Sequence, residues 1–262
     1  MNLRERYIAA NSPLHRLDAR VKLLTALALI VIVVVTPERA WPAYPLYWAL
    51  LAGLAAAGRL GAWRVARAAA LALPFALAAL TLIFTTPGAP VAQIGGLTVT
   101  DAGLERFAAI TLKSWLAAQA ALLLALSTPV VDVLWALESL RVPVTLVQII
   151  GFMYRYLGTL TEEAERLLRA RAARSGVAAG RRSGGRVLWR AQVAGGMVGS
   201  LFLRSYERSE RVYAAMQARG YTGRPARLDG APHPGRDSVV QGAAVVMAAG
   251  AVLLLALFWW GG

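Results

Sequence analysis

Long stretches without a single charged residue recur along the chain and predict its elements. They lie at 23–37, 40–58, 68–100, 114–131 and 238–262. Because a helix needs about 20 apolar residues to cross the hydrocarbon core of a bilayer, each stretch is a candidate transmembrane helix. The first is short, but the aliphatic stems of Arg20 and Lys22 can extend it to the interface. The pattern predicts an all-α, polytopic membrane protein with about five transmembrane helices.

The third stretch should not be helical to its end, because a Pro-Gly-Ala-Pro run at 87–90 interrupts it. Proline removes a backbone hydrogen-bond donor and glycine often ends helices. We therefore expect this helix to finish near Thr86.

The distribution of charge predicts the orientation in the membrane. Basic residues precede the first span and join the second span to the third, whereas the loop at 87–103 carries Asp101 as its first charge. The positive-inside rule then places the N-terminus in the cytoplasm and the loops after spans one and three outside. Asp101 and Trp260, near the C-terminus, should both lie outside the cell.

These observations divide the chain into three parts. Residues 1–131 are expected to form a membrane domain with four spans, and residues 238–262 the fifth span. Residues 132–237 differ in kind, because between Glu162 and Arg227 there are 14 arginines and five glutamates. The sequence predicts a cytoplasmic helical domain there, partly packed on the membrane.

Helical patterning supports order in this basic region. Leu167, Arg171 and Arg174 fall on one helical face, and so do Val212 and Arg219 further along. A solvated loop would not be expected to keep such spacing. Two apolar stretches at 142–154 and 191–203 are too short to span a bilayer.

Composition narrows the possible chemistry. The chain is 58% hydrophobic and 16% charged, with a formal net charge of +14. All basic residues except Lys22 and Lys113 are arginines, which suit bidentate pairing with carboxylates or phosphates. Cysteine is absent, so thiolate ligands and cysteine nucleophiles are excluded.

Two segments of the basic region resemble each other. They read RARAARSG at 169–176 and AMQARGYTG at 215–223, and each follows a glutamate-containing helix start. Acid at the start, base in the last turn and glycine at the end complement the helix dipole and a left-handed cap. This would explain one such end. The repetition, and the alanines around each arginine, favour two arginine anchors that enter carboxylate-lined clefts of a cytoplasmic partner.

The paired signatures resemble those of the transmembrane T components of energy-coupling factor (ECF) transporters. They comprise Ala173, Arg174, Ser175, Ala218, Arg219 and Gly220. The resemblance also covers SPLHRLDARVKLL at 12–24, LESLRVP at 137–143, MYRYL at 153–157 and FLRSYERSERVYAAMQARGYTG at 202–223. The last stretch and the HRLD opening are similar specifically to CbiQ, the T component of cobalt importers. Ser175 departs from the glycine common in the family, and Arg171 could be the signature arginine instead of Arg174.

The resemblance implies a subunit that couples ATP hydrolysis to transport. In this family two cytoplasmic helices present the signature arginines, here Arg174 and Arg219, to grooves on a pair of ABC-type ATPase subunits. They transmit ATP-driven movement to a substrate-binding membrane subunit (S component), here expected to be CbiM-like. The implied location is the bacterial inner membrane, and the implied cargo is cobalt, with nickel or a vitamin as alternatives.

Other functions have less support in the sequence. An ATPase would need a phosphate loop that ends in Gly-Lys-Ser or Gly-Lys-Thr, and no Gly-Lys pair occurs. A membrane-embedded transferase, the alternative from another class, would need clustered acids, which are sparse here. Nucleic-acid binding is not expected, because glutamates interleave with the arginines. No cofactor is expected.

Single polar residues have structural interpretations. His15 and Asp18 could touch a metal, but a structural or capping role is the better interpretation. A channel would need functional polar residues at membrane depth, and Lys113 is the charged candidate, near a span end. Gln119 and Gln148 are interpreted as hydrogen-bonding residues between helices.

Overall fold

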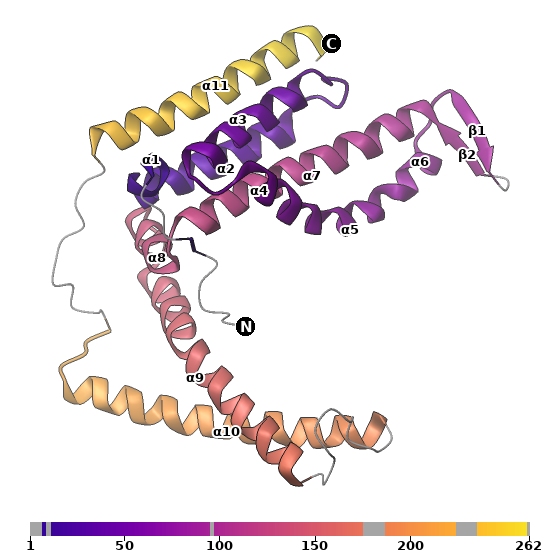
Figure 1. The fold of residues 1–262 in the computed structure, drawn as a ribbon. Helices are drawn as coiled ribbons and strands as arrows, with labels where there is room; N and C mark the ends of the chain where they lie inside the picture. Colours follow the sequence, from indigo (N-terminus) through magenta and orange to yellow (C-terminus); the bar gives the residue numbers. More distant parts are fainter. Residues whose placement is uncertain (1–6, 9–11, 95–96, 175–186, 224–234, 261–262) are drawn as a thin grey trace. The chain divides into compact units, whose positions relative to one another are not determined.

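The computed structural model describes residues 7–8, 12–94, 97–174, 187–223 and 235–260. The chain divides into two compact units (Figure 1). The bundle unit comprises Arg4–Leu140 and His233–Gly262, and the arm unit comprises Arg141–Pro232.

The bundle unit is built from apolar helices packed side by side. Its principal helices are α1 (Pro13–Arg16), α2 (Ala19–Val35), α3 (Ala43–Ala57), α7 (Asp101–Ser127), α8 (Val130–Ser139) and α11 (Arg236–Trp260). Helix α2 lies against α7 and α11, and α3 lies beside them (Figure 1). Tyr47, Leu51, Leu116 and Ala249 are buried at the centre of this packing. The core thus joins helices from both ends of the chain.

Two helices in the described part of the chain are long and apolar enough to cross a membrane, Asp101–Ser127 and Arg236–Trp259. The shorter Ala43–Ala57 is also apolar. The fourth predicted span begins earlier than the uncharged stretch at 114–131, because the Thr100 hydroxyl accepts a hydrogen bond from the Gly103 amide and starts α7 there. Lys113 therefore lies inside α7 and donates to the Val34 carbonyl at 3.1 Å.

The third stretch is helical but segmented. It forms α4 (Ala62–Ala69), the 3-10 turn η1 (Ala70–Ala72), α5 (Leu73–Ala76), the 3-10 turn η2 (Leu77–Thr81) and α6 (Leu82–Thr85). Pro74 lies in the middle of these segments, and its missing amide removes one hydrogen bond of a continuous α-helix. The helical path ends at Thr85, as the Pro-Gly-Ala-Pro run predicts.

The strictly all-α expectation is wrong at one place. Strands β1 (Pro90–Ile94) and β2 (Leu97–Thr100) pair antiparallel, with Gln93 opposite Thr98 and Ile94 opposite Leu97. The strands contain β-branched residues, which favour extended backbone. The rest of the described chain is mostly helical, as expected.

The arm unit consists of two long helices, α9 (Val144–Arg174) and α10 (Val187–Ala218), which contact each other. Neither is apolar enough to count among the candidate spans. Gly195, Gly196 and Gly199 have open space beside them within the described residues. No other described residue therefore packs closely against these glycines.

Candidate coupling site

Helices α9 and α10 enclose an apolar groove. Phe152, Tyr156 and Leu160 of α9 face Val212 and Met216 of α10 across a space of about 360 Å³. The spacing of four residues on each helix is the pattern of one helical face, so the sequence itself directs these side chains to the same side. The groove continues to Tyr221, just beyond the end of α10.

A single carboxylate ties the two helices together next to this groove. Glu163 of α9 accepts hydrogen bonds from Arg166 at 2.8 Å, from Arg204 at 3.0 Å and from Arg208 at 3.4 Å. Arg204 and Arg208 lie one turn apart on α10, so both reach the same acid. The Glu163 side chain is only 13% exposed. Where α9 and α10 cross, Glu163 is therefore the acidic residue to which arginines of both helices bond.

Hydrogen bonds from Arg166 and Arg204 hold the pKa of Glu163 below the ordinary value for glutamate. A lowered folded-state pKa stabilises the folded state above the unfolded pKa, and the contribution disappears as pH falls through the folded value. We expect Glu163→Gln to loosen the α9–α10 crossing at neutral pH, measured as faster amide hydrogen exchange in α10. The wild-type chain should show the same change only under acidic conditions, below about pH 4. Equal exchange in both proteins at neutral pH would contradict this role.

The arginines of the arm unit differ according to their position. Among the described arginines of this unit, salt bridges with glutamate are made by Arg166, Arg169, Arg204, Arg208 and Arg211. Arg174 at the end of α9 and Arg219 directly after α10 are both exposed. Within the described part of the chain, neither takes part in an ion pair.

Arg219 is the cap residue of a Schellman motif. The Tyr221 amide donates to the Met216 carbonyl at 3.0 Å, and the Gly220 amide donates to the Gln217 carbonyl at 2.9 Å. Gly220 has φ +82, the left-handed conformation that glycine adopts without strain. Tyr221 and Met216 both line the groove, and they occupy the two positions between which an apolar contact often accompanies this motif. The Ala-Arg-Gly signature therefore encodes a fixed helix end, as its glycine predicts.

The other signature is described only in part. Ala173 and Arg174 are exposed in the last turn of α9, Arg171 is half-buried, and Ser175 lies outside the described residues. Both Arg171 and Arg174 belong to the basic last turn of α9. The half-burial of Arg171 and the exposure of Arg174 favour Arg174 as the more accessible of the two.

The structure does not bring the two signature arginines together. The segment after Arg219 is hydrogen-bonded to Gln148, near the start of α9, whereas Arg174 is at the end of the same helix. The helix between these two positions is continuous and extends for roughly 40 Å at 1.5 Å per residue. The two helix ends that carry Arg174 and Arg219, the arginine tips, can therefore contact two separate surfaces at once.

Comparisons with known proteins identify relatives of this chain. A family described as cobalt transport protein (CbiQ) matches residues 10–228. The energy-coupling factor transporter transmembrane protein EcfT of Listeria innocua is 30% identical over 234 residues, 85% of each chain. The cobalt transport protein CbiQ of Rhodobacter capsulatus is 33% identical over 187 residues, 68% of this chain and 73% of the relative.

The chain belongs to the CbiQ family. The resemblance seen in the two signatures is thereby confirmed, and the family together with the apolar helices indicates a transporter component in a membrane. The match at 10–228 includes the CbiQ-like opening HRLD and the arm unit up to residue 228.

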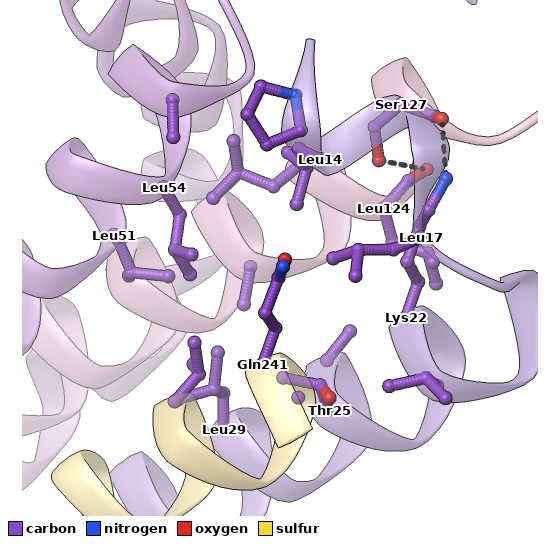
Figure 2. A pocket seen from close by; sticks show the side chains of 18 residues that line it. Leu14, Leu17, Lys22, Thr25, Leu29, Leu51, Leu54, Leu124, Ser127 and Gln241 are labelled. Carbon is purple, nitrogen blue, oxygen red and sulfur yellow. Dashed lines mark hydrogen bonds between the residues drawn. The ribbon is translucent and has the colours of Figure 1, made fainter. Parts of the chain in front are cut away.

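In this CbiQ-family chain the HRLD segment has a structural role. The buried Lys22 ammonium donates to the His15 carbonyl oxygen at 3.3 Å. It also donates to the Ser127 carbonyl oxygen at 3.2 Å (Figure 2). The His15 ring bonds to the Ser12 hydroxyl at 2.7 Å and to the Ile8 carbonyl at 2.9 Å, so both ring nitrogens are occupied. Lys22 and Ser127 also line an apolar pocket, together with Gln241 and Leu51 (Figure 2). The structural interpretation of His15 therefore holds, since its bonds hold the start of the bundle together.

The two glutamines differ in outcome. Gln148 bonds to the segment after α10, close to the helix–helix role expected for it. Gln119 is buried in α7, but its Nε2 has no hydrogen-bond partner within the described residues. Sequence reasoning missed Glu163 as the centre of the arm unit. The available signal was the pair Arg204 and Arg208, one turn apart on α10. Its relation to Glu163 can be recognised only once α9 and α10 are known to cross.

Proposed function

We propose that this chain is the T component, the scaffold and energy-coupling subunit, of an ECF-type ABC importer. It would link ATP hydrolysis in partner ATPase subunits to movement of a substrate-binding membrane subunit. One observation carries the proposal: two exposed arginines lie at the ends of long helices, without acidic partners among the described residues, at positions too far apart to share one small site.

Arg174 and Arg219 would enter acidic grooves on two ATPase subunits. Arginine suits this role because its planar guanidinium forms bidentate, charge-assisted bonds with carboxylates. The Glu163 crossing and the apolar groove couple α9 to α10, so displacement of one tip is passed to the other helix. A coupling subunit must make different contacts in two states. When the two ATPase subunits close, the distance between the grooves that receive Arg174 and Arg219 would change.

Cobalt is the proposed cargo, and the substrate-binding subunit would be CbiM-like. The family description and the cobalt transport protein of Rhodobacter capsulatus support this assignment. A second candidate is an ECF importer of a different substrate, such as a vitamin, because EcfT of Listeria innocua covers more of the chain. Radioactive cobalt uptake in a strain that lacks the chain, with and without its return, separates the two. Unchanged cobalt uptake would favour the second candidate.

The partner proposal is tested by affinity purification of the tagged chain from its native membranes. We expect ABC-type ATPase subunits and a second membrane protein to remain bound in mild detergent. A folded chain that is recovered alone under these conditions would contradict the proposal.

We also propose a multi-pass arrangement in the bacterial inner membrane, with five spans and residues 132–237 on the cytoplasmic side. Because the chain has no cysteine, Asp101→Cys and Trp260→Cys each introduce a unique thiol. Both should react with an impermeant maleimide added to intact spheroplasts. An Arg211→Cys control should react only after permeabilisation. The opposite pattern would reverse the orientation.

A further inference from the structure

Gln148 makes an unusual pair of contacts within the arm unit. The Tyr221 hydroxyl donates to Gln148 Oε1 at 3.0 Å, and Gln148 Nε2 donates to the Gly223 carbonyl at 3.2 Å. One side chain at the start of α9 thus uses its acceptor and one of its donors on the short segment directly after α10. Tyr221 and Gly223 are two and four residues beyond Arg219.

This segment needs support to hold a fixed direction. Gly220 and Gly223 both have positive φ, at +82 and +89, and glycine restricts the backbone less than any other residue. Helix ends also fray, because their last carbonyls lack partners within the helix. The Schellman bonds close the end of α10, but they connect it only to α10 itself. The two Gln148 bonds connect it to another helix.

The contact is directional as well as local. Tyr221 places its ring in the apolar groove beside Met216 and its hydroxyl on Gln148. Packing of the ring alone leaves the orientation of this segment free, because apolar contacts have little directionality. The hydrogen bonds to the Gln148 amide are directional, so they restrict that orientation. Since Arg219 precedes Tyr221 by only two residues, holding Tyr221 in place also restricts the backbone at the exposed Arg219.

We infer that Gln148 is a positioning residue for Arg219, holding the second arginine tip in the orientation in which it meets its partner. The inference rests on the proposed function in one respect, the docking of Arg219 on an ATPase subunit. It goes beyond that proposal because it makes the orientation of Arg219, directly after α10, depend on a residue near the start of α9. Arg174, at the far end of α9, should be independent of Gln148.

The first test uses the full chain alone, in detergent. Gln148→Ala removes both bonds, and Tyr221→Phe removes one while retaining the ring in the groove. Both variants should speed amide exchange at Gly220 and Tyr221 by about threefold to tenfold, the effect expected of losing one or two hydrogen bonds. Gln192→Ala, an exposed glutamine on α10, is the matched control and should leave this exchange unchanged. Wild-type exchange in both Gln148→Ala and Tyr221→Phe would overturn the inference.

The second test measures binding to the ATPase subunits that co-purify with the wild-type chain. Gln148→Ala should weaken binding about threefold to tenfold in the wild-type background. It should have no further effect in Arg219→Ala, but its full effect in Arg174→Ala, because only interacting positions are non-additive. An equal effect in both backgrounds, or none in the wild-type chain, would overturn the role of Gln148. Should Arg219→Ala itself leave binding unchanged, the proposed function fails instead, and the exchange test still judges the Gln148 contacts.

Discussion

The double variant Arg174→Ala/Arg219→Ala is expected to fold and insert normally but to lose ATPase binding and transport. Both side chains are exposed and, within the described residues, unpaired, so their removal disrupts no internal salt bridge. A desolvated arginine anchor at an interface typically contributes about 2 kcal/mol or more, so each single variant should weaken binding by roughly 30-fold. Co-purification with the ATPase subunits and cobalt uptake measure the loss.

The matched control is Arg169→Ala/Arg211→Ala. It removes the same charge from the same two helices, but at exposed arginines paired with Glu165 and Glu207. Exposed salt bridges contribute little, so this variant should bind nearly as the wild type does. Equal losses in both double variants would mean that net charge, not the helix ends, determines binding. Full transport by Arg174→Ala/Arg219→Ala would contradict the coupling role.

The second large effect is expected at the start of α7. A Cβ at Gly103 would lie 2.7 Å from the carbonyl oxygens of Leu82 and Ile83 and from the Thr100 hydroxyl. Backbone carbonyls cannot rotate away as a flexible side chain can, so Gly103→Ala must separate α6 from α7. Overpacking of this kind costs about 3 kcal/mol. The thermal unfolding midpoint in detergent should fall by several degrees.

Gly53→Ala provides the comparison, because nothing lies within 4 Å of a Cβ at Gly53 in α3. Alanine in a helix interior is more favourable than glycine by roughly 0.5–1 kcal/mol, so this variant should be unchanged or slightly more stable. A similar loss in both variants would contradict the close approach of α6 and α7. Reduced transport by a stable Gly53→Ala variant would instead indicate an external contact at this face.

The sequence predicted those parts of the fold that depend on local patterns. Uncharged stretches located the apolar helices, and the proline-rich run located the end of α6 at Thr85. They did not locate the start of α7, because Lys113 interrupts the pattern although its ammonium has a partner in the Val34 carbonyl. The hairpin at Pro90–Ile94 and Leu97–Thr100 was also missed, since its alternation is short and lies within a longer uncharged stretch.

For the candidate site, the sequence predicted the helix ends better than it predicted the side-chain contacts that hold those ends in place. Gly220 after Ala218-Arg219 signals a left-handed cap, and that cap is present. The role of Glu163 and the partners of Gln148 were not predicted, because the contacts that these residues make beyond α9 are with residues 41 to 75 positions away along the chain. Such contacts depend on how α9 and α10 cross, which no periodicity within one helix specifies.

The most direct measurement for the coupling account is site-specific cross-linking from the second tip. Thr222 is exposed three residues after Arg219, and Thr222→Cys would carry the sole thiol of an otherwise cysteine-free chain. A photoactivated cross-linker at this position, in membranes active in ATP-driven uptake, should join the chain to an ABC-type ATPase subunit. Its yield should change when ATP is added. Active transport without any cross-link to an ATPase from this position would contradict the account.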